Sequence, residues 1–352
     1  MTSRAASDPR PHLKDLPIEE LRASLAREGL APYRADQIAG WLYGRGVDDP
    51  AAMSDLGLEL RERLRGAWRT RALEIERVAT SRDGTQKALL RAADGAELES
   101  VAIPDEDRTT LCLSTQVGCP LECSFCATGA LGFTRNLSTA EIVDQVCRMR
   151  EVLGPERRIT NLVFMGMGEP LLNLPAVLRA IRILLHPKGF GFVGRRITVS
   201  TAGVVPKLAA LLEAAPVNLA VSLHATTDAL RDELVPLNRR FPLSVLLGEL
   251  RRLPQITERR PVFFEYTLMR GVNDAPDDAR RLVALLRGLP SKVNVIPMNP
   301  HPDARHRPPE EATVDRFLGE LSRAGLTVTL RRSRGADIDA ACGQLAARGA
   351  PA

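Results

Sequence analysis

The sequence lacks the features of membrane, secreted and nucleotide-binding proteins. Its 352 residues contain no long apolar run, and the opening stretch is rich in Ser, Arg, Asp, Pro and Lys. Only six cysteines occur, three clustered and three scattered, which does not suit a secreted disulfide framework. The glycine turn at 166–168 lacks the third glycine of a dinucleotide fingerprint and the Gly-Lys-Ser/Thr of a phosphate-binding loop. We therefore expect a cytoplasmic protein that does not enter the membrane.

A cluster of three cysteines is the most informative motif that is present. Cys119, Cys123 and Cys126, here called the cysteine triad, lie in the run Gly-Cys-Pro-Leu-Glu-Cys-Ser-Phe-Cys. Three thiolates can ligate three irons of a 4Fe–4S cluster and leave the fourth iron open to a substrate or cofactor. A structural zinc site would need four ligands, usually as two separated pairs, and the nearest further thiol is the single Cys112. The triad therefore predicts a catalytic iron–sulfur cluster.

The charge of the chain is moderately basic. The formal net charge is +5 and the isoelectric point is near 9. Basic residues are spread over short runs at 61–71, 157–158, 195–196, 239–240 and 331–334. Such runs are more often solvated faces than binding sites, so the charge permits RNA binding without requiring it.

The hydrophobic pattern divides the chain into four parts. Helical spacing of Ile18, Leu21 and Leu25 predicts a helical accessory module over residues 1–71. An alternating pattern with a turn at Asp94-Gly95 predicts a β-rich bridge over 72–104. Apolar runs that alternate with helical segments predict a core over 105–337, and 338–352 form a tail.

The core pattern predicts a parallel α/β fold. Its candidate strands are 111–116, 162–165, 197–200, 219–223, 262–268 and 293–297, and the clearest helix begins at Ser138 with a capping box to Glu141. Repeated βα units of this number indicate a barrel or an incomplete barrel, with the active site at the carboxyl ends of the strands. Polar clusters follow the strands there, at 166–170, 200–203, 222–224 and Asn299.

At these motifs the chain resembles the radical S-adenosylmethionine RNA adenine C2-methyltransferases. The resemblance covers the chain from about Leu16 and rests on the triad and on five segments: Gly-Met-Gly-Glu-Pro at 166–170, Ser-Thr-Ala-Gly at 200–203, Ser-Leu-His at 222–224, Met-Asn-Pro at 298–300, and Arg-Gly-Ala-Asp-Ile-Asp-Ala-Ala-Cys-Gly-Gln at 334–344. The triad alone indicates only the radical superfamily, and Cys342 in the tail narrows the resemblance to this branch. It implies a partial (β/α)6 radical S-adenosylmethionine barrel with an N-terminal helical module, which we expect to bind RNA.

The resemblance implies a reaction with two mechanistic thiols. Adenine C2 is electrophilic and does not attack a methyl sulfonium, so a radical route is required. Cys342 would first take a methyl group from one S-adenosylmethionine, and the cluster would cleave a second one to a deoxyadenosyl radical that activates this methyl group. Cys112 would then break the covalent RNA adduct by attacking the Cys342 sulfur, with Glu99 as the proton acceptor. Without the resemblance, Glu99 is an ordinary strand glutamate, and Cys112, Cys342 and Cys147 are small buried residues.

The resemblance also implies ligand contacts and partners. S-adenosylmethionine contacts fall on Gly168, Glu169, Ser200, Ser222, Leu223, His224 and Asn299. The implied RNA targets are an adenosine in the peptidyl-transferase region of 23S rRNA and the adenosine 3′ of the anticodon in some tRNAs. We also expect a reduced electron donor such as flavodoxin or ferredoxin, and a monomer.

Two alternatives remain open at this point. A related branch methylates C8 of the same rRNA adenine and shares the cysteines. A protein of another class, a non-catalytic iron–sulfur RNA-binding protein, would have no use for Cys342. Seen without the family, a single strand-end histidine such as His224 is more often structural than catalytic.

Overall fold

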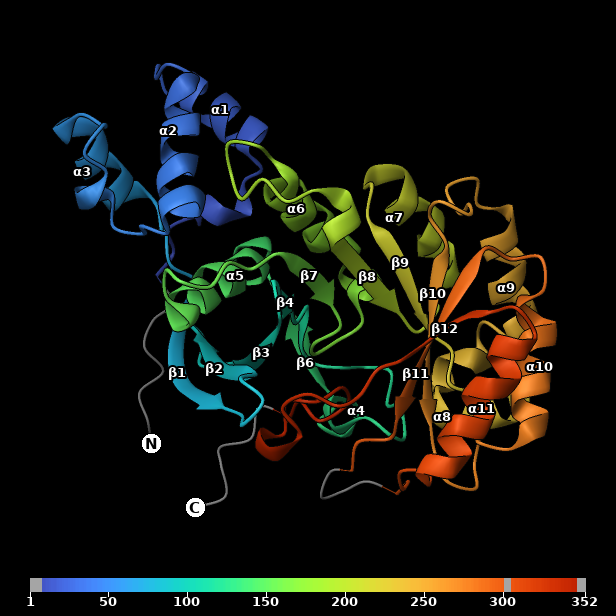
Figure 1. Cartoon of the computed structure of the whole chain (residues 1–352). Helices are drawn as coiled ribbons and strands as arrows, with labels where there is room; N and C mark the ends of the chain where they lie inside the picture. The colour runs from blue at the N-terminus through green and yellow to red at the C-terminus, as the bar shows by residue number, and fades with distance from the viewer. Residues whose placement is uncertain (1–7, 301–304, 347–352) are drawn as a thin grey trace.

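The fold is built on a curved ten-stranded sheet with helices along its outer side (Figure 1). The computed structural model describes residues 8–300 and 305–346. The large sheet has the order β1-β2-β3-β4-β7-β8-β9-β10-β11-β12, and β5 pairs with β6 separately. The strands are β1 (Leu73–Thr80), β2 (Gln86–Ala92), β3 (Glu97–Asp105), β4 (Arg108–Cys112), β5 (Gln116–Gly118), β6 (Phe133–Asn136), β7 (Asn161–Phe164), β8 (Ile197–Thr201), β9 (Asn218–Ser222), β10 (Val262–Leu268), β11 (Ser291–Pro297) and β12 (Thr327–Leu330).

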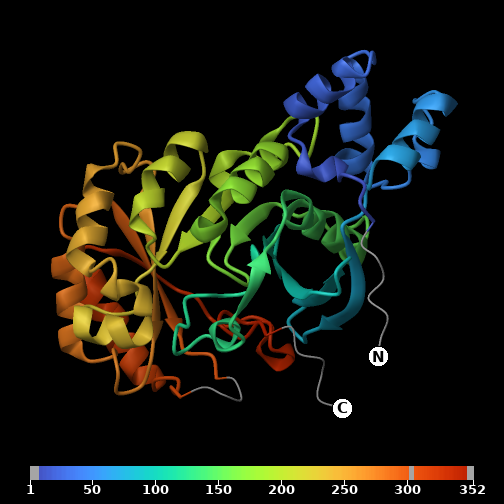
Figure 2. The same cartoon turned by 180° about the vertical axis from the view of Figure 1, so that it is seen from behind.

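The sheet is parallel from β4 to β12. Helices follow six of these strands in turn: α5 (Thr139–Leu153), α6 (Leu174–Leu185), α7 (Leu208–Ala214), α8 (Asp228–Leu234) with α9 (Leu243–Arg252), α10 (Pro276–Leu286) and α11 (Glu311–Arg323). Figure 2 shows from behind that they cover the convex side of the sheet. The predicted partial (β/α)6 barrel is confirmed. No helix in the described ranges is both long and apolar enough to cross a membrane.

Three antiparallel strands extend this sheet at the β4 edge. Strands β1, β2 and β3 occupy the stretch where the sequence predicts a β-rich bridge. The β2–β3 hairpin turns at the predicted Asp94-Gly95, where Gly95 has a positive φ of 84°. The capping box that predicts the start of α5 is also present, because Ser138 Oγ accepts from Glu141 N–H and Glu141 Oε2 accepts from Ser138 N–H.

The first predicted core strand is shorter than expected. The pattern predicts a strand over 111–116, but β4 ends at Cys112 and Gln116 begins β5. Ser114 N–H donates to the Gln145 side chain at 2.8 Å instead of to a neighbouring strand, which ends the ladder. The chain can therefore turn out of the sheet just before the cysteine triad.

The last strand of the sheet, β12, is absent from the sequence prediction. It has four residues, and two of them, Thr327 and Thr329, are exposed. An edge strand with one neighbour needs little apolar surface, so its pattern is weak. It pairs in parallel with β11 and directs the C-terminal tail back toward the barrel opening (Figure 1).

The N-terminal module packs against one end of the barrel, over α5 and α6 (Figures 1 and 2). It contains α1 (Ile18–Arg27), α2 (Tyr33–Ala39) and α3 (Leu58–Ala67). Ile18, Leu21 and Leu25 are buried, as their helical spacing predicts. In this module Tyr43 is buried, whereas Trp41 is half-buried and donates from Nε1 to Asp55 at 2.5 Å.

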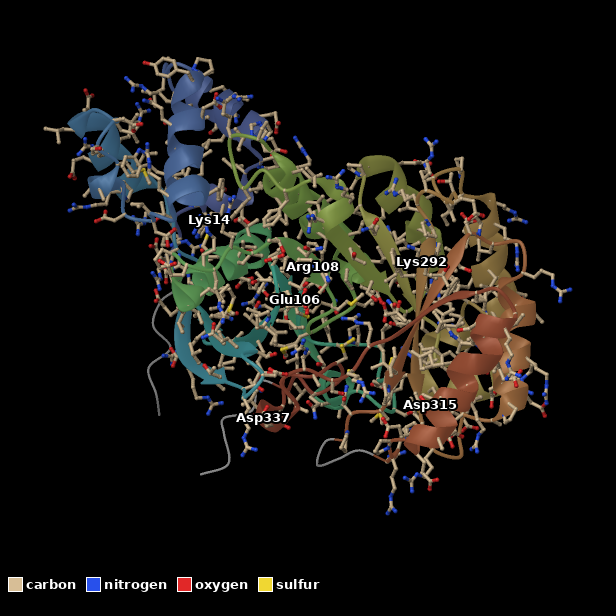
Figure 3. All side chains as sticks on the ribbon, in the orientation of Figure 1. Lys14, Glu106, Arg108, Lys292, Asp315 and Asp337 are labelled. Carbon is tan, nitrogen blue, oxygen red and sulfur yellow. The ribbon has the colours of Figure 1, made fainter. Side chains whose placement is uncertain are left out.

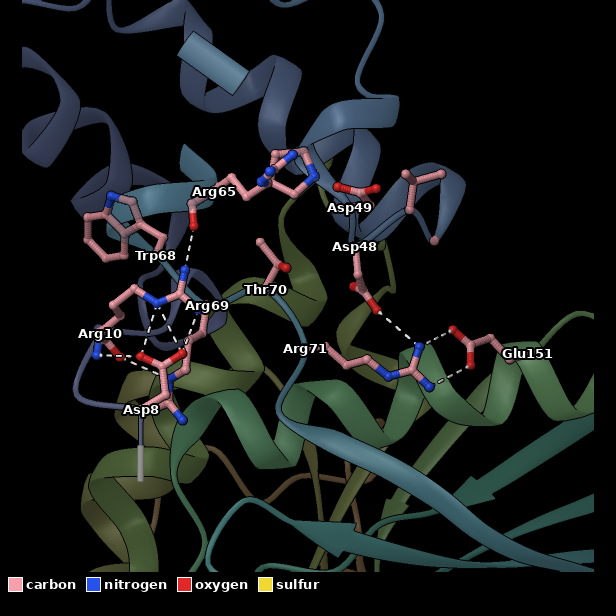
Figure 4. A pocket seen from close by; sticks show the side chains of 13 residues that line it. Asp8, Arg10, Asp48, Asp49, Arg65, Trp68, Arg69, Thr70, Arg71 and Glu151 are labelled. Carbon is pink, nitrogen blue, oxygen red and sulfur yellow. Dashed lines mark hydrogen bonds and ion pairs between the residues drawn. The ribbon is translucent and has the colours of Figure 1, made fainter. Parts of the chain in front are cut away.

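A buried charge cluster joins this module to the core. The Lys14 ammonium (Figure 3) lies 2.6 Å from Asp48 of the module and also pairs with Asp144 of α5. Arg71 approaches Asp48 and Glu151 at the edge of the cluster (Figure 4). The pocket drawn there, about 600 Å³, is lined by none of the residues that the sequence predicts for the active site.

Candidate active site

The cysteine triad lies in the loop between β5 and α4 (Ala127–Ala130). Close backbone contacts fix this loop: Cys119 N–H donates to Gly132 O at 2.8 Å, and Cys126 N–H donates to Cys123 O at 3.1 Å. Gly118 has a φ of 74°, and a Cβ on it would lie 1.9 Å from Gly132 O. Only glycine fits this position, so the loop conformation is set by the residue before the first cysteine.

The three thiols share one electrostatic environment. Burial raises the pKa of Cys119 to about 12, with Cys126 and Glu169 adding to the shift. Burial likewise raises the pKa of Cys123 well above its usual range, and both other triad cysteines contribute. Within residues 8–300 and 305–346, no three or more His, Cys, Asp or Glu side chains form a group that could hold a metal ion. If each thiol of the triad ligates a separate iron, the three can hold a multi-iron cluster, whose positive charge would stabilise the thiolates.

The turn after β7 lies against this loop. Gly168 has a φ of 99°, and a Cβ on it would lie 2.6 Å from Cβ of Gln116, the first residue of β5. Glu169 is 3% exposed, and its carboxylate accepts from Leu171 N–H at 3.0 Å and from Ala202 N–H at 2.7 Å. Burial raises the pKa of Glu169 to about 7 against these hydrogen bonds. Glu169 thus ties the turn after β7 to the segment after β8 beside the triad.

The ends of β8 and β9 bring the predicted serines and histidine to the same edge. Ser200 on β8 aligns with Ala220 of β9, and Ser222 aligns with Glu265 of β10. His224 is buried with a φ of 58°, and its ring lies 4.6 Å from the ring of Phe125 in the cysteine loop.

His224 is a neutral hydrogen-bonding group in this arrangement. Its Nδ1 accepts from Thr267 N–H at 3.0 Å, so Nε2 carries the proton. Burial, with Arg231 nearby, lowers the pKa of His224 to about 3. Its contact with Phe125 supports the cysteine loop, and its predicted role toward S-adenosylmethionine stays a prediction.

A buried arginine that the sequence analysis missed organises this edge. Arg231 of α8 is 1% exposed and donates to three main-chain oxygens: Leu223 at 3.0 Å, Ala202 at 2.7 Å and Ser222 at 3.1 Å. Burial lowers its pKa to about 10, and Cys123 opposes the shift. An arginine on a short helix gives no sequence signal for such a role, because only tertiary packing aims it inward.

The C-terminal tail docks on the cysteine loop. Gly343 O accepts from Ala127 N–H at 2.8 Å, at the start of α4. Leu345 O accepts from Thr128 Oγ1 at 2.5 Å. Cys342 O accepts from Asn299 Nδ2 at 3.0 Å, after β11. The predicted ligand residue Asn299 therefore holds the tail in this structure.

Glu99 fastens the same tail from the opposite side of the site. It lies on β3 and is 1% exposed. Its Oε1 pairs with Lys87 at 2.9 Å, and its Oε2 accepts from Ala346 N–H at 2.9 Å. Lys87 also donates to Asp339 O at 3.0 Å, so a lysine that the sequence analysis missed links the predicted proton acceptor to the tail.

The structure brings Cys112 and Cys342 into one electrostatic environment. Burial raises the pKa of Cys112 to about 12, and Cys342 contributes to the shift. Cys342 is exposed to water, yet the protein around it is dense enough to raise its pKa as well, with Arg331 opposing and Glu265 and Cys126 adding to the shift. Cys342 is therefore accessible to solvent and lies near both Cys126 of the triad and Cys112. Cys147 is buried against Leu42 O, as expected of a core residue.

Comparisons with known proteins agree with these features. A family model of the radical SAM superfamily matches residues 113–283, and a model described as the ribosomal RNA large subunit methyltransferase N-terminal domain matches 12–68. A dual-specificity RNA methyltransferase RlmN of Geobacter sulfurreducens is 52% identical over 95% of this chain and 91% of its own length. The RlmN of Syntrophobacter fumaroxidans is 50% identical over 95% of this chain and 98% of its own length. The crystal structure of a radical SAM methyltransferase from Sphaerobacter thermophilus is similar with a TM-score of 0.90 and 46% identity, covering 96% of this chain and 100% of that one.

Proposed function

Because this chain belongs to the dual-specificity RNA methyltransferase family and is an RNA methyltransferase of the radical S-adenosylmethionine class, we propose that it methylates C2 of adenosine in RNA through Cys342 and Cys112. The proposed targets are an adenosine in the peptidyl-transferase region of 23S rRNA and the adenosine 3′ of the anticodon in some tRNAs. Such substrates agree with a cytoplasmic enzyme that acts as a monomer and takes its electron from a flavodoxin or ferredoxin.

The docking of Cys342 beside the triad is the observation that carries this proposal. Gly343 bonds to Ala127, the residue directly after Cys126, and Asn299 holds the carbonyl of Cys342 itself. A scaffold protein would need no solvent-exposed thiol at this place. A methyl-carrying thiol must lie there, because its methyl group has to be near the cofactors.

The proposed roles follow from the position of each group. The triad would hold a 4Fe–4S cluster, and Gly168, Glu169, Ser200, Ser222, Leu223, His224 and Asn299 would surround S-adenosylmethionine. When bound, these cofactors would supply the methyl group for Cys342 and the radical that activates it, and the cluster would take back the electron left unpaired on the RNA adduct. Glu169 has both carboxylate oxygens engaged by main-chain N–H groups, so it shapes the pocket and presents a buried acceptor to a ligand ammonium.

Cys342 and Cys112 carry out different steps of the proposed reaction. Cys342 as a thiolate accepts a methyl group, and this methyl carbon later becomes bonded to C2 of the adenine. Glu99 then accepts the C2 proton, which requires its Oε2 to exchange Ala346 N–H for the substrate. Cys112 finally attacks the Cys342 sulfur, which releases the methylated RNA and leaves a disulfide.

Separate substitutions of the two thiols test this proposal. Cys342→Ala removes the methyl acceptor, so no covalent RNA–protein species forms. Cys112→Ala leaves that species intact and removes the thiol that breaks it, so RNA accumulates on the protein as a nuclease-sensitive band on a denaturing gel. The proposal is wrong if Cys112→Ala gives no such band while Cys342→Ala behaves as the wild type.

The position of the methyl group has its own test. RNA from a deletion strain, before and after complementation, is digested and analysed by mass spectrometry. We expect 2-methyladenosine to return with the gene. Appearance of 8-methyladenosine would assign the chain to C8 methylation, and the absence of any methylated adenosine would favour a non-catalytic RNA-binding role.

A further inference from the structure

Arg331 lies directly after β12, and its side chain contacts residues of two neighbouring strands or strand ends. Its main-chain N–H donates to Val295 O at 2.9 Å, which extends the pairing of β11 and β12 by one residue. Its Nη1 lies 3.5 Å from Glu265 Oε2 and 3.8 Å from Met165 Sδ. The guanidinium is thus fixed between β10 and the segment after β7.

The buried carboxylate of Glu265 holds this guanidinium in place. It lies on β10 and is 4% exposed, and its Oε1 accepts from Asn294 Nδ2 at 2.8 Å. Its Oε2 is buried and accepts no hydrogen bond from the described residues. A buried carboxylate oxygen without a hydrogen bond is costly unless a charge compensates it, and Arg331 is the cation next to it.

Met165 lies between Arg331 and the strand segment that pairs with Cys112. Cys112 pairs with Val163 in the β4–β7 ladder, two residues before Met165. The Met165 side chain in turn contacts Arg331. Burial and Cys342 raise the pKa of Cys112, whereas the Met165 amide and Arg331 lower it. Cys112 must act as a thiolate, and burial strongly disfavours that form.

We propose that Arg331 is a positioning residue that stabilises the thiolate of Cys112 for its attack on the sulfur of Cys342. The inference rests on the proposed function, because it concerns the step that breaks the RNA adduct. In that step a bond forms between the two cysteine sulfurs, and the bond between the Cys342 sulfur and the methylene carbon breaks. The bonding electrons go to the carbon, which gains a proton from solvent and becomes the methyl group. The two sulfurs are oxidised to a disulfide and the carbon is reduced, so no further reactant is needed.

Arg332 provides a matched control. It follows Arg331 in the chain and carries the same charge, but its side chain is 76% exposed and lies 3.5 Å from Glu311. Arg332→Gln therefore removes the same charge from the same segment without changing the environment of Cys112.

The experiment measures the decay of the RNA adduct. Reduced holoenzyme is mixed under anaerobic conditions with S-adenosylmethionine and an end-labelled transcript of the peptidyl-transferase region. Samples are denatured at intervals, and the protein-linked RNA is quantified on a gel. Methylation of Cys342 is checked by the mass of tryptic peptide 335–348, which contains no other cysteine. The decay rate constant does not depend on how much adduct forms.

We expect Arg331→Gln to slow adduct decay by roughly threefold or more, since a rise of about one unit in the Cys112 pKa lowers the thiolate fraction tenfold while the higher pKa makes each thiolate more nucleophilic. Arg331→Lys should recover most of the decay rate, and the adduct of Arg332→Gln should decay at the wild-type rate. If the RNA adduct of Arg331→Gln decays at the wild-type rate while that of Cys112→Ala persists, the role of Arg331 is overturned and the proposed function stands. A failure of Arg331→Lys to recover the rate shows that charge is not the cause and also overturns it. The absence of an adduct in Cys112→Ala refutes the proposed function and this inference together.

Discussion

Replacement of Lys14 by Met should loosen the N-terminal module from the core. The Lys14 side chain is 0% exposed and pairs with Asp48 of the module and Asp144 of α5. Methionine keeps most of the apolar stem and removes the charge. Asp144 would retain Arg148 at 3.5 Å and the N–H groups of Ala72 and Leu73, but it would lose its closest cation.

The expected magnitude follows from the burial of this pair. Removal of one partner from a buried ion pair costs about 3–5 kcal/mol, because the other charge stays buried without compensation. For a chain of this size, about 2 °C of melting temperature corresponds to each kcal/mol, so we expect a decrease of roughly 6–10 °C. Thermal unfolding followed by circular dichroism measures the difference. Lys188→Met, which removes an exposed lysine, is the control.

The difference in stability between the wild type and Lys14→Met should depend on pH. Burial acts to raise the pKa of Asp144, but Lys14 and Arg148 hold it below its usual value of 3.8. In the wild type, Asp144 therefore contributes stability that is present above about pH 4 and is lost as the pH falls through its lowered pKa. In Lys14→Met the effect of burial on the Asp144 pKa outweighs that of the remaining cation. The ionised Asp144 carboxylate then destabilises the folded protein, and this destabilisation grows as the pH rises above 4. The gap between wild type and variant should be smaller at pH 4 than at pH 7. A gap below about 1 kcal/mol at pH 7, equal to that of Lys188→Met, would refute this reasoning.

Three further predictions concern the cluster loop and RNA binding. Substitution of any triad cysteine by Ala should remove a thiolate that the loop cannot replace, so iron content and cleavage of S-adenosylmethionine should both collapse; a variant that keeps full iron contradicts the assignment. Gly118→Ala should also lower the iron content, because its Cβ would lie 1.9 Å from the oxygen of Gly132, whereas Gly154→Ala, with a similar φ of 70° and no atom within 4 Å, should retain the iron. Arg63→Gln on the exposed face of α3 should weaken RNA binding and reduce the slope of log affinity against log salt by about one, if this arginine contacts a phosphate; an unchanged slope places the RNA contact elsewhere.

Much of the framework followed from local sequence patterns. The alternation of apolar runs and helical segments gave the six βα units, because a parallel strand buried on both faces is a continuous apolar run. The capping box at Ser138 fixed the start of α5, because it satisfies main-chain groups within four residues. The ends of strands were predicted less accurately: β4 stops at Cys112, and two residues later the side chain of Gln145, distant in sequence, accepts from Ser114 N–H.

The residues of the candidate site were also predictable from the sequence only in part. The spacing of Cys119, Cys123 and Cys126 within one loop indicated a cluster, because ligands so close in sequence need no knowledge of the fold. The family resemblance, and not the residues by themselves, selected Glu99, Cys112 and Cys342 from ordinary strand and tail positions.

The tertiary structure alone decided what surrounds these groups. The segment 331–346 after β12 reaches the start of α4 and β3, where Ala127 and Glu99 hold its main chain. No local rule predicts these contacts, because the partners are more than 200 residues apart in the chain. Arg231 and Arg331 were likewise indistinguishable from surface arginines in the sequence. Their roles depend on low local polarity and on nearby carbonyls, thiols and carboxylates, which exist only once distant strands are assembled side by side.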